Sequence, residues 1–203
     1  DNLVWVERQE GDHWVDPENP HAKVRVTKGG VTRYYKEPEY AFAWIDADAL
    51  VEVLKDAEFG GDLVVTNGAA VTLVSTNATP YALTRRGETE IRVLPGASLT
   101  VTNAVLDGNG ATSTIGFVKV EGEEASLELQ AGAVVRNVIG KADRASGAIS
   151  VQKGGTFTMR SGAVIVDCEN RYAIKRFKTA DYIGYGGGLL VEGQSSTANL
   201  LGG

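Results

Sequence analysis

The amino-acid sequence predicts an all-β fold, a right-handed parallel β-helix with three short strands in each coil and coils of about 28 to 30 residues. Two observations predict it. Similar segments recur along the chain at a nearly constant spacing, and each carries apolar residues at equivalent positions. Glycine accounts for 25 of the 203 residues and proline for only 5, which indicates many tight turns between strands rather than disorder.

Four segments share a pattern of strand, glycine-containing turn and second strand. An apolar residue at the same place in each recurs after 28, 28 and 30 residues. One coil cannot bury its own inward face, so equivalent strands stack on one another at roughly 4.8 Å per coil. An antiparallel sandwich also uses short alternating strands, but it gives no reason for this spacing. The four segments are residues 64–73, 92–101, 120–129 and 150–159.

The alternation within the second strand of each segment predicts which side chains face inward and which face solvent. Two apolar columns should run through the interior, with a polar column between them on the outside. The columns are Val71, Leu99, Leu127 and Phe157, then Leu73, Val101, Leu129 and Met159, with Thr72, Thr100, Glu128 and Thr158 outward.

A third strand follows in each coil, at 132–138 and 162–168, with a shorter counterpart at 103–108. A fifth copy of the repeat starts at Leu189 and ends at Leu200, which lies 43 residues after Phe157. Compared with a spacing of 30, this predicts an insertion of about 13 residues in the preceding coil.

Residues 1–57 lack the repeat and contain all three tryptophans and both histidines. We expect this segment to cap the first coil, because the edge of a stack of parallel strands is prone to pair with other chains. Its alternating residues predict a hairpin with arms at 22–28 and 31–35, joined by Gly29 and Gly30. A short helix within 39–50 should follow.

A strand at 51–54 then leads into the parallel β-helix, which occupies 58–203. No polar cap is visible at the C-terminal edge of this region. We therefore expect further coils in a longer parent protein, or another chain, at that edge. The first residue is Asp1 and no signal peptide is visible, which favours a mature or excised fragment.

Charge and composition exclude several classes of function. The net charge of -6 argues against nucleic acid as a partner, because phosphate binding needs a basic surface. The apolar runs are too short to insert into a membrane. The single cysteine, Cys168, excludes an internal disulfide, and we interpret it as a small core residue.

Parallel β-helices also host polysaccharide lyases and hydrolases, which need clustered carboxylates or a bound cation. The acidic and basic residues of the coils fall in different bends. The two histidines have no metal-ligand spacing with Cys168. We therefore predict no catalytic residue, no metal site and no cofactor. The residues considered were Asp107, Asp143, Asp167 and Asp181, with Arg136, Arg144, Arg171 and Lys175.

The inserted stretch 171–185 is the predicted ligand-binding segment. It concentrates basic and aromatic residues in an acidic protein, and such side chains can stack on sugars or hold acidic groups. The alternative is that the stretch folds over the flank of the coils. A second, weaker candidate is 81–86, which contains two adjacent arginines. The residues singled out in the first segment are Arg171, Tyr172, Lys175, Arg176, Phe177, Tyr182 and Tyr185.

With these motifs in place, the chain resembles the pectin-lyase-like β-helix regions of adhesin-like surface proteins in Gram-positive bacteria. Two stretches carry the resemblance. Residues 40–65 contain an aromatic-rich helix, a strand ending in Leu-Lys-Asp and the first coil. Residues 154–165 and 186–193 are similar to the repeated unit of those regions.

The resemblance implies an extracellular location, at the cell surface or cell wall, and an adhesive role with a glycan or a host surface protein as partner. Two alternatives stay open. One is a polysaccharide lyase or glycoside hydrolase with a site on the flank of the helix. The other is a structural stalk or assembly segment.

Overall fold

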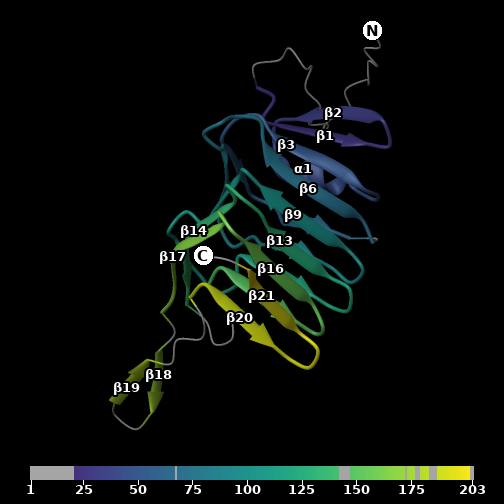
Figure 1. Cartoon of the computed structure of the whole chain (residues 1–203). Helices are drawn as coiled ribbons and strands as arrows, with labels where there is room; N and C mark the ends of the chain where they lie inside the picture. Colours follow the sequence, from purple (N-terminus) through teal and green to yellow (C-terminus); the bar gives the residue numbers. More distant parts are fainter. Residues whose placement is uncertain are drawn as a thin grey trace.

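The structure is a computed structural model that describes residues 21–66, 68–141, 147–171, 173–176, 179–182 and 187–201, with the backbone alone for 173–176 and 179–182. Within these residues the fold consists of strands and one short helix (Figure 1). The predicted all-β class is confirmed, and so is the parallel pairing of strands that stack on one another.

The chain passes through three parallel sheets in rotation, which we call sheets A, B and C. From Ala49 onward, each coil passes through sheet A, then sheet B, then sheet C; the third coil places two strands in sheet B, and two later strands pair, among the described strands, only with each other. Each such passage is one coil, and successive coils pair in parallel. The bends between the sheets therefore lie one above another.

Sheet A has eight strands, of which the first two in space form the N-terminal hairpin. In spatial order they are β2 (Val31–Tyr35), β1 (Val24–Lys28), β3 (Ala49–Val53), β6 (Ala70–Ser75), β9 (Ser98–Thr102), β13 (Ser126–Leu129), β16 (Thr156–Arg160) and β21 (Thr197–Leu201).

Sheets B and C follow the same order of coils. The strands of sheet B are β4 (Ala57–Phe59), β7 (Ala82–Arg85), β10 (Val105–Asp107), β11 (Thr112–Ser113), β14 (Val134–Gly140) and β17 (Val164–Asn170), with β10 and β11 both alongside β14. The strands of sheet C are β5 (Leu63–Val65), β8 (Ile91–Val93), β12 (Val118–Glu121), β15 (Ile149–Gln152) and β20 (Leu189–Glu192).

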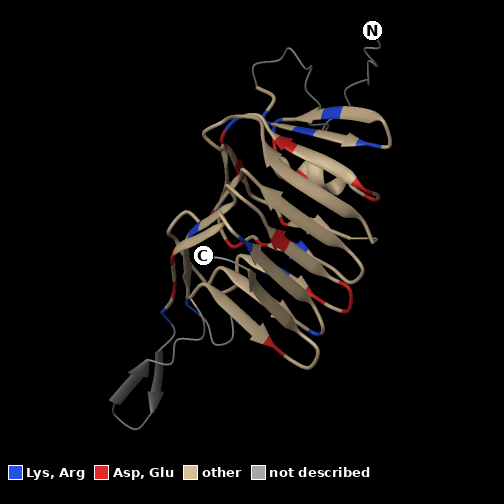
Figure 2. Ribbon diagram, in the orientation of Figure 1, with Lys and Arg blue, Asp and Glu red and all other residues tan. Residues whose placement is uncertain are grey.

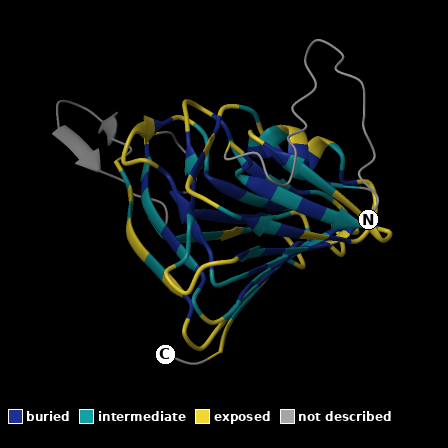
Figure 3. Cartoon of the chain, turned by 90° about the horizontal axis from the view of Figure 1, so that it is seen from above, coloured by how far each residue is buried: buried dark blue, intermediate teal, exposed yellow. Residues whose placement is uncertain are grey.

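The inward columns of sheet A are those that the sequence predicts. Leu99 lies opposite Val71 on one side and Leu127 on the other, and Leu127 lies opposite Phe157. These four side chains are at most 2% exposed. Seen from above, buried and partly exposed residues alternate along the strands (Figure 3), as expected when one face of each sheet packs against the core.

The predicted register of the fifth repeat, which placed Leu200 opposite Phe157, was wrong by two residues. Phe157 lies opposite Ala198, and Leu200 lies opposite Met159. The spacing from Phe157 is therefore 41 rather than 43 residues, and the insertion is 11 rather than 13 residues long. The sequence misled because a small residue, Ala198, takes the place that larger apolar residues occupy in the other coils.

The N-terminal hairpin is confirmed, with β1 and β2 paired antiparallel around Gly29 and Gly30. Strand β1 also pairs antiparallel with β3, so it covers the edge of the first coil in sheet A. The helix α1 (Pro38–Ala43) is shorter than predicted, because the chain is already extended again in β3 by Ala49. Residues 1–20, including Trp5, Trp14 and His13, lie outside the described residues.

At the other end of sheet A, β21 exposes apolar side chains. Leu200 is 65% exposed and Leu201 is 51% exposed. The prediction that further coils or another chain cover this edge stays a prediction. In sheet A, the strands β6, β9 and β21 carry no charged side chain, whereas β1, β2 and β3 carry several (Figure 2).

Candidate binding site

The predicted binding segment is only partly described. Arg171 follows β17, and its Nη2 donates to the carboxylate of Glu169, which raises the pKa of the guanidinium. Strands β18 (Ala173–Arg176) and β19 (Thr179–Tyr182) pair antiparallel with each other and with no other described strand. The side chains of Lys175, Arg176 and Tyr182, and all of Tyr172, Phe177 and Tyr185, lie outside the described residues.

The prediction that residues 81–86 form a second binding surface is wrong at Arg85. This side chain points into the core and is only 1% exposed. Its Cζ lies 5.2 Å from the ring centroid of Phe117, and its Nη1 donates to the carbonyl of Gly116 at 3.4 Å. Nη2 has no hydrogen-bond partner among the described residues. Burial lowers the pKa of this guanidinium.

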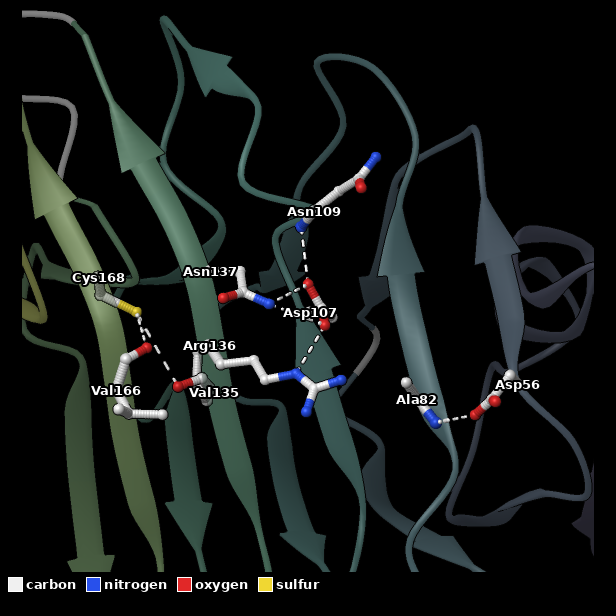
Figure 4. Close-up of polar contacts among 9 residues, drawn as sticks. All are labelled: Asp56, Ala82, Asp107, Asn109, Val135, Arg136, Asn137, Val166 and Cys168. Carbon is white, nitrogen blue, oxygen red and sulfur yellow. Dashed lines mark hydrogen bonds and ion pairs between the residues drawn. The ribbon is translucent and has the colours of Figure 1, made fainter.

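Asp107 and Arg136, predicted to lie in separate bends, meet in neighbouring coils of sheet B (Figure 4). The Nε of Arg136 donates to Oδ2 of Asp107 at 2.6 Å, and the backbone N–H of Asn109 donates to Oδ1 at 2.8 Å. The side-chain amide of Asn137 lies 3.2 Å from both oxygens. The two residues are 29 positions apart, which is one coil of the repeat, so the spacing already placed them at equivalent positions, and the prediction of separate bends was wrong.

In this geometry Asp107 links two neighbouring coils through hydrogen bonds and is not placed to act as a catalytic acid or base. The residue is 7% exposed. Burial alone would raise the pKa of its carboxyl, but the hydrogen bonds from Asn109, Arg136 and Asn137 outweigh burial and hold the pKa below its ordinary value. Both oxygens already accept hydrogen bonds, so neither is placed to take a proton from a substrate.

Three aspartates of the first coil perform a similar task at its three bends. Each precedes a strand and accepts a hydrogen bond from a backbone N–H in the next coil, which gives that donor a partner. The pairs are Asp48 with Ala70 at 2.8 Å, Asp56 with Ala82 at 2.8 Å (Figure 4) and Asp62 with Glu90 at 3.0 Å.

Of the remaining predicted acids and cations, Asp167 is described and exposed, with a φ of 53° next to the 55° of Asn137 in the coil before. Both residues turn the chain at the same point of sheet B, which is a role that Asn and Asp tolerate well. Asp143, Arg144 and the side chain of Asp181 lie outside the described residues.

The described part of the molecule contains a shallow hollow of about 490 Å³ on the outer face of sheet A, beside the bend to sheet B. It is lined by residues at equivalent places in four successive coils, one strand spacing of roughly 4.8 Å apart, together with residues of the bend. They are Thr102, Gln130, Ala131, Arg160, Ser161 and Leu201. We call this the sheet A hollow.

An ion pair beside the sheet A hollow fixes two of its polar side chains. Arg160 donates from Nε to Oε1 of Glu128 at 2.6 Å and from Nη2 to Oε2 at 2.9 Å. Gln130 donates from Nε2 to Oε1 of Glu128 at 2.6 Å. The hydrogen bond from Arg160, with that from Gln130, lowers the pKa of the Glu128 carboxyl.

Sequence reasoning did not single out this site, although a signal was present. Thr102, Gln130 and Arg160 recur at the 28- and 30-residue spacing of the repeat, each directly after an inward apolar residue. The sequence therefore already indicated a polar column, one position beyond the inward apolar column. What the repeat could not show is that the bend leaves a hollow beside that column.

No protein-family model, curated protein or solved structure matches this chain. Within the described ranges, no three His, Cys, Asp or Glu side chains gather in a way that could hold a metal ion. In the same ranges, no helix is long and apolar enough to cross a membrane. Among the described residues, the sheet A hollow and the hydrogen bonds that link neighbouring coils are the features that bear on function.

Proposed function

We propose that this chain is a right-handed parallel β-helix module of an extracellular protein at a bacterial cell surface or wall, and that it binds a glycan or a host surface protein without transforming it. The polar sheet A hollow carries the proposal. It lies on stacked parallel strands, which hold side chains more rigidly than a loop does.

The state of two described acids, Asp107 and Glu128, supports binding over catalysis. The Asp107 carboxylate accepts hydrogen bonds from Arg136 and Asn137, and the Glu128 carboxylate accepts them from Arg160 and Gln130. A glycoside hydrolase needs one carboxyl group to give a proton and another to act as base or nucleophile. Neither of these carboxylates offers that pairing, whereas fixed donors and acceptors around a shallow hollow suit recognition.

A binding screen combined with a cleavage assay tests this function. The 203-residue chain is immobilised and exposed to a glycan array and to matrix proteins, and the same chain is incubated with polysaccharides. The expected result is reversible binding with no new reducing ends and no unsaturated product. Cleavage of any polysaccharide, or no binding across both panels, would contradict the proposal.

A further inference from the structure

We infer that the sheet A hollow is a binding site for an uncharged saccharide, held by Arg160, Gln130 and Thr102. This inference rests on the proposed function and names the ligand class and the residues of the site. Three properties of the hollow lead to it: the hydrogen-bonding groups that remain free, the balance of charge, and the apolar surface beside them.

The free polar groups include both donors and acceptors. Arg160 uses Nε and Nη2 on Glu128, so the two N–H groups of Nη1 remain for a ligand. Gln130 uses its amide nitrogen on Glu128, so its carbonyl oxygen remains as an acceptor. The hydroxyl of Thr102 donates to the carbonyl of Ala131 at 3.3 Å and can still accept. A sugar hydroxyl is both donor and acceptor, and it matches such a mixed set.

The balance of charge decides against an anionic ligand. Glu128 is held ionised by its hydrogen bonds, since these lower its pKa, and its charge cancels that of Arg160. A carboxylate or sulfate approaching Arg160 would meet the Glu128 carboxylate as well, which repels it. The strands of sheet A around this pair are largely uncharged (Figure 2). An uncharged ligand meets no such repulsion.

The apolar part of the hollow comes from Ala131 and from Leu201, which is 51% exposed. A pyranose ring has C–H faces as well as hydroxyls, so it gains from contact with such a surface. The polar residues lie on consecutive strands, roughly 4.8 Å apart. A linear oligosaccharide lying across the strands would therefore meet a polar side chain at three successive coils and Leu201 at the fourth.

Glu128 is a positioning residue in this scheme. It does not need to touch the ligand, but it orients the guanidinium of Arg160 and the amide of Gln130 and keeps the site neutral. Replacing Glu128 by Gln preserves its shape and removes its charge. The site should then carry the positive charge of Arg160 and accept acidic saccharides better than before.

The test follows the backbone amide signals of the isotopically labelled 203-residue chain by NMR during titration with cellotriose, maltotriose and trigalacturonate. We expect saturable shifts at residues 102, 130, 131, 160 and 161 with a neutral trisaccharide and weaker ones with trigalacturonate. Gln130→Ala and Arg160→Lys should each weaken binding about tenfold, as expected for loss of one or two hydrogen bonds. Glu128→Gln should strengthen the response to trigalacturonate several-fold.

The matched control is Lys153→Ala, which removes an exposed cation that also pairs with a glutamate, Glu121, but at the bend from sheet C to sheet A. Its binding should equal that of the unchanged chain. Neutral saccharide shifts that map elsewhere, or a preference for trigalacturonate in the unchanged chain, would overturn the inference while leaving the proposed function intact. Absence of binding to every saccharide and matrix protein would overturn both.

Discussion

Arg85 places a permanent positive charge in the interior, because a guanidinium does not lose its proton in proteins. The structure offers it the ring of Phe117, one long hydrogen bond to Gly116 and the Coulombic attraction of Glu88. Nη2 has no partner among the described residues, and neither does the buried hydroxyl of Thr89, in the bend that follows. A buried charge with so little compensation costs free energy of folding.

We expect Arg85→Met to leave the free energy of unfolding unchanged or to raise it by about 1–4 kcal/mol, as replacement of poorly compensated buried charges often does. Methionine fills much of the space and needs no partner. Urea unfolding followed by circular dichroism measures the change. Arg85→Ala is the control, since it removes the charge but leaves a cavity and should be less stable than Arg85→Met. A loss of several kcal/mol in Arg85→Met would show that the charge has a partner outside the described residues.

Glu121 predicts how stability depends on pH. Hydrogen bonds from Lys119 and Lys153 lower the pKa of its carboxyl from the ordinary 4.5 to about 2. The ionised form is therefore favoured in the folded state, and its contribution is present above pH 4.5 and is lost as the pH falls from 4.5 toward 2. Because Lys153 is 72% exposed, solvent screening limits the contribution to about 1 kcal/mol.

Glu121→Gln should therefore reduce stability at pH 7 by about 1 kcal/mol or less and flatten the decline between pH 4.5 and pH 2. Thermal unfolding at a series of pH values measures this. The control is Glu123→Gln, which changes an exposed glutamate of the same bend. If both variants decline with pH like the unchanged chain, the Glu121 ion pairs contribute nothing.

At the scale of the elements, side-chain acceptors take part in strand stacking. Asp56 precedes β4 and accepts from the backbone of Ala82 at the start of β7. In the next coil of sheet B a backbone carbonyl makes the equivalent contact, as Tyr81 does for Val105. At this place in sheet B, the first coil therefore uses an aspartate side chain and the next coil uses the main chain.

We expect Asp56→Ala to lower the free energy of unfolding by about 1–2 kcal/mol, because the N–H of Ala82 loses its acceptor. Asp56→Asn keeps an oxygen in the same place and should lose much less. Chemical denaturation of the three proteins measures the difference. Equal losses in the two variants would mean that the charge of Asp56 matters and the hydrogen bond does not.

The sequence could predict strands and inward columns because burial imposes the same apolar residue type at every turn of the repeat. Leu99 and Leu127 were placed correctly for that reason. Contacts on the outer face follow no such rule. The repeat places Asp107 and Arg136 at equivalent positions of neighbouring coils, but it does not show that their side chains form an ion pair. The burial of Arg85 reverses the usual preference of its residue type. The fifth register failed where Ala198 weakened the pattern.

At the scale of the whole molecule, strand pairing within the described residues joins each coil only to the coils before and after it, although Phe59 of the first coil also stacks on Phe117 of the third. Unfolding of such a stack can start at an end and spread one coil at a time. In sheet A, β1 protects the first coil through an antiparallel pairing, whereas β21 pairs on one side only within the described residues.

Hydrogen exchange of the 203-residue chain should therefore show a gradient along the stack. Amides of β9 and β13 should exchange most slowly, and amides of β20 and β21 faster, because opening the last described coil disrupts one interface instead of two. Peptide-resolved mass spectrometry measures the exchange. Uniform protection from β6 to β21 would indicate that the stack opens as one unit.

The reversed direction of β1 has a consequence for how such a molecule can change size. Another coil cannot be added before β3 in sheet A without displacing a strand that runs the opposite way. Downstream of β3, a duplicated block such as 70–97 would meet neighbours of its own register, because Ala70 already lies opposite Ser98. Each added coil would lengthen the stack by roughly 4.8 Å. The length of this fold can therefore change only in whole coils, and only downstream of β3.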